Sequence, residues 1–114
     1  MDLETYTALV QRWQPQMATP PMVAGWLVRI ARQVPHLVRR LERARAGASL
    51  PIDRTEATLR RDLGYVLYLV TRLALAHGWT PAEVLDDCVA RWQERRAVTA
   101  QDLAAARLAA SKGA

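Results

Sequence analysis

Residues 53–78 read DRTEATLRRDLGYVLYLVTRLALAHG, and this stretch decides the fold class. Its apolar residues recur at steps of three and four, which is the period of an α-helix. The core-facing stripe is predicted to comprise Leu59, Leu63, Val66, Leu67, Val70, Leu73 and Ala74. Asp53-x-x-Glu56 is a variant of the capping box and Gly78 is a typical helix stop, so the pattern predicts one helix from Asp53 to His77.

A second apolar face lies on the same predicted helix, at Tyr65, Leu69 and Ala76. A helix that is apolar on two sides needs two partners, and a short helical chain buries only a modest core by itself. We therefore expect the protein to associate with itself, as a homodimer or a higher homo-oligomer.

Four further helices are predicted on either side of this stretch. Asp2 caps a helix that runs to about Gln14, and Thr19 followed by Pro20 begins one that runs to about Ala46. Pro35 falls inside the latter and should kink it, since the apolar stripe resumes in phase afterwards. The two remaining predicted helices cover residues 81–97, after the Thr80 cap, and 100–110, after Thr99-x-x-Asp102.

The whole pattern is all-α, because no stretch alternates with the period of a strand. We expect an arrangement like a four-helix bundle, or half of a dimeric one, over residues 1–97. Residues 98–114 are rich in alanine and are expected to add a short C-terminal helix and tail. The four tryptophans, Trp13, Trp26, Trp79 and Trp92, are predicted to anchor the core or an interface.

The composition is that of a globular protein, with 51% hydrophobic and 24% charged residues. No apolar run approaches the roughly 20 residues that a membrane span requires. The acidic opening has no apolar segment of a signal peptide, and the single cysteine, Cys88, cannot form an internal disulfide. We therefore expect a soluble cytoplasmic protein without a membrane partner.

The net charge of +5 comes almost wholly from arginine, since Lys112 is the only lysine. Arginine favours bidentate contact with phosphate or carboxylate, so the charge indicates an anionic partner. A GC-rich genome explains the same bias, and both interpretations stay open. Arg29, Arg32, His36 and Arg40 share one face of the predicted 20–46 helix with Gln33.

With Arg61 and Asp62 of the following helix, this basic face forms a candidate anion site, and a solvated charged face is the alternative. Arg91, Arg95 and Arg96 cluster near the end of the 81–97 helix, where cations also complement the helix dipole.

Catalytic and metal motifs are sparse. The spacing of His36, His77 and Cys88 matches no zinc motif. His77 lies beside the Gly78 stop, where a structural role suffices, and Cys88 lies in an apolar stripe as a small core residue. The sequence contains no glycine-rich phosphate loop and no serine nucleophile motif.

Two segments resemble the MazG-like branch of the all-α nucleoside triphosphate pyrophosphohydrolases. Asp62-Leu63-Gly64-Tyr65-Val66-Leu67-Tyr68-Leu69 resembles that family's second metal-binding segment. His77-Gly78-Trp79-Thr80-Pro81-Ala82-Glu83-Val84-Leu85 resembles the turn and the helix that follow it. The resemblance extends over about residues 2–96. It implies a MazG-type fold, dimers or tetramers, and cleavage of nucleotides between the α and β phosphates with magnesium.

The residues that correspond to the family's magnesium-binding acids are largely replaced. The matching positions are Arg32, Gln33, His36, Asp62 and Tyr65, of which only Asp62 is acidic. Basic residues at such positions should repel magnesium rather than bind it. Arg91 and Arg95 keep the basic character of positions that contact phosphate in the family.

These departures lead to three functional hypotheses. The first is a MazG-like protein without hydrolase activity and without a cofactor, which binds a nucleotide or phosphate or acts in assembly. The second is an active pyrophosphohydrolase with a relocated magnesium site, in which Asp86, Asp87 and Glu94 join Asp62. The third is a basic helical module that binds nucleic acid, although the sequence contains no helix-turn-helix signal.

Overall fold

A computed structural model describes residues 1–13 and 18–113, and every regular element in this part of the chain is a helix. The elements are α1 (Leu3–Trp13), α2 (Pro20–Arg45), α3 (Ile52–Ala76), α4 (Pro81–Glu94) and α5 (Ala100–Gly113). The predicted all-α class is confirmed. The predicted end of the first helix at Gln14 lies outside the described residues.

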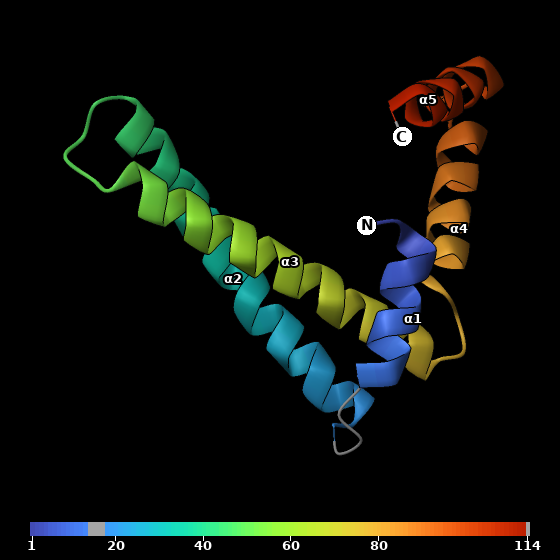
Figure 1. Cartoon of the computed structure of the whole chain (residues 1–114), viewed down its shortest axis with the longest axis horizontal. Coiled ribbons are helices and arrows are strands. Elements are labelled where there is room, and N and C mark those ends of the chain that lie inside the picture. Colours follow the sequence, from blue (N-terminus) through green and yellow to red (C-terminus); the bar gives the residue numbers. More distant parts are fainter. Residues whose placement is uncertain (14–17, 114) are drawn as a thin grey trace. The chain divides into compact units, whose positions relative to one another are not determined.

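The chain divides into two compact units, Met1–Thr80 and Pro81–Ala114. In the first unit α2 and α3 form a long antiparallel hairpin, and α1 packs against α3 (Figure 1). The second unit consists of α4 and α5. The sequence predicted a helical domain over residues 1–97 and a C-terminal helix and tail over residues 98–114. That division stays a prediction.

Backbone hydrogen bonds show why three of the helices end where they do. After α2, the Ala48 amide donates to the Arg43 carbonyl at 3.0 Å and Gly47 has a φ of +101°. After α3, the Trp79 amide donates to the Ala74 carbonyl at 3.0 Å and Gly78 has a φ of +81°. Both ends are Schellman motifs, in which glycine takes the left-handed conformation without steric cost.

The end of α4 has the same motif without glycine. The Ala97 amide donates to the Trp92 carbonyl at 2.9 Å, and Arg96 adopts a φ of +59°. The helix therefore ends at Glu94, and the predicted end at residue 97 is wrong. No glycine marks this stop, which is why the sequence pattern extended the helix too far.

Two of the predicted N-caps are confirmed by side-chain hydrogen bonds. The Thr5 amide donates to Asp2 Oδ1 at 2.7 Å. At the start of α5 the Asp102 amide donates to Thr99 Oγ1 at 3.1 Å, and the Thr99 amide donates to Asp102 Oδ2 at 2.9 Å. These bonds lower the pKa of both aspartates, because they favour the ionised carboxylate. Thr19 is the N-cap residue of α2 but makes no side-chain cap bond, and Pro20 and Pro21 after it have no amide hydrogen to donate.

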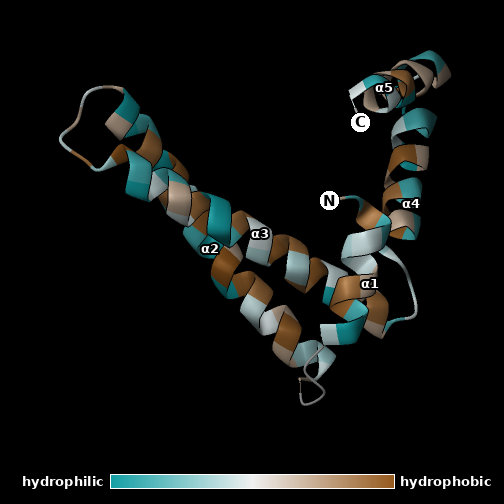
Figure 2. Cartoon of the chain, in the orientation of Figure 1, coloured by the Kyte–Doolittle hydropathy of each residue, from teal (hydrophilic) through white to brown (hydrophobic). Residues whose placement is uncertain are grey.

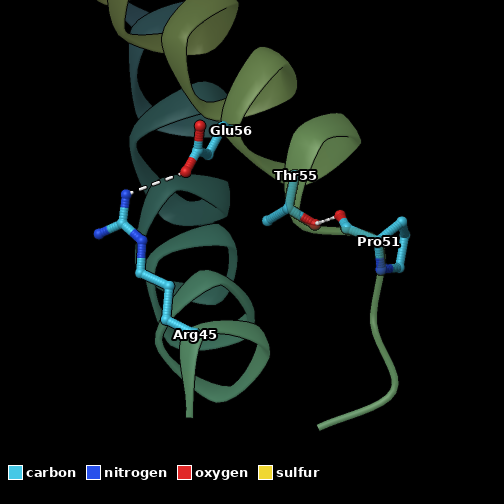
Figure 3. A network of polar contacts seen from close by, with 4 residues as sticks. All are labelled: Arg45, Pro51, Thr55 and Glu56. Atoms are coloured by element: carbon cyan, nitrogen blue, oxygen red, sulfur yellow. Dashed lines mark hydrogen bonds and ion pairs between the residues drawn. The ribbon is translucent and has the colours of Figure 1, made fainter. Parts of the chain in front are cut away.

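The start of α3 differs from the prediction. The N-cap is Pro51, so Asp53 lies inside the first turn and does not cap the helix. Glu56 instead accepts a hydrogen bond from Arg45 Nη2 at 3.1 Å, which joins α3 to the end of α2. Thr55 Oγ1 donates to the Pro51 carbonyl at 2.9 Å beside it (Figure 3). Glu56 of the predicted capping box therefore forms an inter-helix ion pair and not a cap.

Pro35 lies within α2, which continues through it as one helix. A mid-helix proline leaves the carbonyl four residues earlier without its usual donor. Pro35 and Ala31 both lie on the exposed face, so water can hydrate that carbonyl. The continuity of the helix agrees with the prediction, and the kink stays a prediction.

The core of the hairpin uses only part of the stripe predicted on α3: Ala74 is buried and Leu59, Val66 and Leu73 are half-buried. Leu69, which the sequence placed on the second face, is completely buried. Leu63, Leu67 and Val70, which the sequence placed in the core, are 45%, 65% and 41% exposed. Both faces are apolar, so the period alone could not decide which one packs on α2. The α2 stripe is better predicted, since Val23 and Leu41 are buried.

Large hydrophobic side chains remain exposed in both units. Trp13, Trp79 and Trp92 are exposed, so these three do not anchor the core, while Trp26 is half-buried. The alternative, that the exposed tryptophans anchor an interface, stays a prediction. Neither α4 nor α5 buries any residue. Figure 2 shows hydrophilic residues gathered toward the closed end of the hairpin, where α2 ends and α3 begins. Among the described helices, none is both long and apolar enough to cross a bilayer.

Candidate functional site

The first unit contains a groove of about 980 Å³ between α1, α2 and α3, which we call the aromatic groove. Helix α1 contributes Tyr6, Leu9, Val10 and Trp13. Helix α2 contributes Trp26 and Ile30. Helix α3 contributes Arg61, Asp62, Gly64, Tyr65, Tyr68 and Arg72. All three tyrosines of the chain and two of its four tryptophans therefore lie around one hollow.

The aromatic rings of the groove contact one another. The ring centroids of Trp13 and Tyr68 are 5.9 Å apart with planes inclined at 58°. Those of Tyr65 and Tyr68 are also 5.9 Å apart, at 31°. Tilted pairs at this distance are favourable arrangements for aromatic side chains. The contacts hold α1 against α3 and give the groove a wall on which a planar ring can stack.

Charged groups enter this apolar groove from α3 alone. Asp62 is buried, and one of its carboxylate oxygens lies 3.4 Å from Arg61 Nε. The Arg61 side chain is 76% exposed, so most of its guanidinium remains open to a ligand. Arg72 is buried, with its guanidinium carbon 5.7 Å from the centre of the Tyr68 ring. This is a cation–π contact, which holds positive charge against the aromatic wall.

The structure brings together only part of the predicted anion site. Arg61, Asp62 and Tyr65 line the aromatic groove. His36 and Arg40 lie instead beside a separate hollow on α2, together with Arg39, Glu42, Arg43 and Ala46. Arg29, Arg32 and Gln33 are exposed and line neither hollow.

Arg91 and Arg95 belong to the second unit, where both are exposed. Their predicted contact with phosphate therefore concerns a unit separate from the groove. Cys88 is half-buried on α4, which buries no residue, so its predicted place in a core is not confirmed.

Nine of the twelve groove residues were not predicted as site residues, among them Tyr6, Trp13, Trp26, Tyr68 and Arg72. A signal for two of them was present in the spacing. Arg61, Tyr65, Tyr68 and Arg72 follow one another at four, three and four residues, which places them on one helix face. Tyr6 and Trp26 belong to other helices, and no local pattern could assign them to this wall.

The residues present do not fit a magnesium site of the kind the resemblance implies. Within residues 1–13 and 18–113, no three side chains of histidine, cysteine, aspartate or glutamate come close enough together to hold a metal ion. His77, the more C-terminal of the two histidines, lies 2.8 Å from the Leu73 carbonyl through Nδ1 and stacks on Trp79 at 5.3 Å. This contact confirms the structural role predicted for His77.

Comparison with known proteins gave no relative: no family model, curated protein or solved structure matches the chain. The resemblance to MazG-like pyrophosphohydrolases therefore rests on the two quoted segments and stays a prediction. The aromatic groove, which is defined by the structure alone, is the feature from which function is argued.

Proposed function

We propose that this chain binds a nucleotide, or a ligand of the same chemistry, in the aromatic groove and does not hydrolyse it. The observation that carries the proposal is the meeting of aromatic rings in mutual contact with arginine in one hollow. A nucleotide has a planar base that can stack on the aromatic side chains and a phosphate that arginine can bind. The separate hollow beside His36 and Arg40 has arginines but no tyrosine or tryptophan.

Each part of such a ligand has a matching group. The base stacks on the open side of the wall that Trp13, Tyr65 and Tyr68 form together. The exposed guanidinium of Arg61 offers a bidentate contact to phosphate. The buried Asp62 carboxylate beside it accepts a hydrogen bond from a ring amino group or a sugar hydroxyl.

The absence of hydrolysis follows from the replaced acids. Of the positions that resemble the family's magnesium ligands, Asp62 alone can bind a metal as a carboxylate. Magnesium is usually held by one or two carboxylates together with substrate phosphates, and Arg61 occupies the space beside this one. The alternative, an active enzyme with acids of α4 at a relocated site, predicts magnesium-dependent release of pyrophosphate from a nucleoside triphosphate.

Binding is tested by calorimetric titration of the wild type with a panel of nucleoside mono-, di- and triphosphates. Gly64 lines the groove, and a Cβ atom added there meets no other atom within 4 Å. Gly64→Leu should therefore fill part of the groove and weaken binding at least tenfold without unfolding the helix. Gly25→Leu is the matched control, because Gly25 lies on α2 outside the groove with the same free space.

Failure of every nucleotide to bind, or equal loss in both glycine variants, would refute the groove as the site. Pyrophosphate release measured on the same panel with magnesium and with manganese separates the two functional hypotheses. Turnover would contradict a binding protein and favour the relocated site.

We further propose that two copies pair through the exposed apolar face of α3 and so complete a four-helix arrangement. Leu63, Leu67 and Val70 recur at steps of four and three, so they form one continuous stripe. A second α2–α3 hairpin with the same stripe is complementary to it in length and chemistry.

The test of this pairing is the mass in solution, measured by light scattering during gel filtration. The wild type is expected to be a dimer, and Leu67→Glu a monomer. Leu108→Glu introduces the same charge at an exposed leucine of α5 and should leave the mass unchanged. A monomeric wild type would refute the pairing.

A further inference from the structure

The α2 helix carries a row of basic side chains, which we call the basic stripe: Arg29, Arg32, His36, Arg39, Arg40 and Arg43. All six are exposed. At about 100° per residue, they fall within one sector of about 100° on the helix surface. Every position of α2 in that sector between Arg29 and Arg43 is arginine or histidine. The stripe is therefore an uninterrupted basic surface, opposite the face that carries the buried Leu41.

Within residues 1–13 and 18–113, no carboxylate forms an ion pair with the basic stripe. The ion pairs found among the described residues join Arg45 to Glu56 and Arg61 to Asp62, and neither includes the stripe. Within the stripe the only polar side-chain contact recorded is the 3.0 Å approach of Arg39 Nη2 to His36 Nδ1. Glu42, the one acidic residue of α2, lies outside the sector; it borders the hollow of His36, Arg39, Arg40 and Arg43 but forms no ion pair with them.

The net positive charge of the protein also arises in residues 1–80, the part of the sequence that contains the stripe. Acidic and basic residues are equal in number across residues 81–114, so the net charge of +5 arises within residues 1–80. A random distribution of arginine, as a base-composition bias alone would give, does not predict one uninterrupted stripe on one helix. The arrangement indicates a linear anionic partner.

The surroundings of the stripe decide which polyanion fits. An amphipathic helix binds a membrane surface by inserting its apolar face, but the apolar face of α2 packs against α3. Single-stranded nucleic acid is held by aromatic residues beside the basic groups, and the stripe has none. An acidic protein partner would need an apolar centre of contact, whereas only the isolated Val28 and Val38 are exposed on this helix beyond Met22 at its start.

We propose that the basic stripe binds the phosphate backbone of double-stranded nucleic acid without reading its sequence. From Arg29 to Arg43 the helix rises about 21 Å, at 1.5 Å per residue. That length spans about six phosphates of one strand, which follow each other at about 3.4 Å along the duplex axis. The five arginines can thus neutralise consecutive phosphates of one strand, and the surface is separate from the aromatic groove.

Counterion release gives the expected size of the effect. With up to five phosphates neutralised, the logarithm of the affinity should fall with the logarithm of salt concentration at a slope of about −3 to −5. Removal of three arginines should reduce that slope by about 3 and weaken binding roughly thirtyfold or more at 0.1 M salt.

The experiment is fluorescence anisotropy with a labelled random-sequence DNA duplex, between about 50 and 200 mM salt. The test variant is Arg32→Gln, Arg39→Gln and Arg40→Gln combined. The control removes the same charge from the second unit, through Arg96→Gln, Arg107→Gln and Lys112→Gln. A third variant with lysine at positions 32, 39 and 40 keeps the charge. Circular dichroism checks that each variant keeps its helices.

We expect similar affinity for the duplex in the wild type, the control and the lysine variant. The glutamine variant of the stripe should bind the duplex roughly thirtyfold or more weakly. Equal losses in both glutamine triples would overturn the proposal, because net charge would then be the cause. Failure of the wild type to bind at the lowest salt would also overturn it. So would tighter binding to the single strand, or binding to anionic vesicles alone.

Discussion

Arg96 is the residue whose conformation departs most from what its side chain favours. Its φ of +59° closes the Schellman motif after α4, a position that glycine occupies after α2 and α3. A residue with a Cβ atom pays about 1–2 kcal/mol for the left-handed conformation. The second unit, which buries no side chain of α4 or α5, has little packing with which to offset that cost.

We therefore expect Arg96→Gly to stabilise the end of α4 by about 0.5–1 kcal/mol, after the greater freedom of glycine in the unfolded chain is deducted. The measurement is hydrogen exchange of the Ala97 amide, which donates to the Trp92 carbonyl. Arg95→Gly is the control, because Arg95 has no positive φ and glycine there should destabilise the helix. Faster exchange of the Ala97 amide in Arg96→Gly than in the wild type would show that the conformation of Arg96 is not strained.

The capping hydrogen bond from the Thr99 amide at the start of α5 depends on pH, because the ionised carboxylate of Asp102 accepts it. Hydrogen bonds from the Thr99 backbone and side chain lower the pKa of Asp102 below its ordinary value of 3.8. A group with a lowered pKa in the folded state adds stability above its unfolded pKa and loses it as the pH falls through the folded one. The cap should therefore hold at neutral pH and at pH 4, and open only below that.

The shift of the Thr99 amide proton with pH measures this directly. Its midpoint is expected below 3.8, and in Asp102→Asn the shift should be independent of pH in this range, since the amide oxygen still accepts the bond. A midpoint at or above 3.8 would show that the carboxylate does not cap the helix in solution.

At the scale of elements, the α2–α3 hairpin depends on one face of α3. Leu69 is completely buried there, and truncation of a buried leucine to alanine costs about 2–5 kcal/mol. We expect Leu69→Ala to lower the free energy of unfolding by that amount in urea. Leu108→Ala removes the same atoms from a side chain that is 56% exposed, and its effect should stay within about 0.5 kcal/mol. Similar losses in both variants would contradict the observed packing.

The sequence predicted the helices well, and the reasons are local. Asp2, Thr99 and Gly78 act through hydrogen bonds and dihedral angles a few residues away, so their signals are legible in a short window. Arg96 gave no such signal, because the stop it forms usually requires glycine. The choice between two apolar faces of α3 depends on the distant α2, and the period of the pattern contains no information about it.

At the scale of the whole molecule, the parts of the candidate site that lie on one helix were predicted, and the contacts between helices were not. Arg61, Asp62 and Tyr65 were predicted because they lie on one helix. Their grouping with Arg29 and Arg32 was not borne out in either hollow, since shared charge does not bring two helix faces together. The wall from α1 depends on contacts such as that of Trp13 with Tyr68, which only the folded chain reveals.

The central claim is that the aromatic groove binds a ligand with an aromatic ring and a phosphate. The four tryptophans test it with a built-in control, since Trp13 and Trp26 line the groove whereas Trp79 and Trp92 do not. The most direct measurement is the indole N–H signals in an NMR titration with the tightest nucleotide of the panel. We predict saturable shifts of Trp13 and Trp26 with Trp79 and Trp92 unchanged. Shifts confined to Trp79 or Trp92, or no shifts with any nucleotide, would contradict the account.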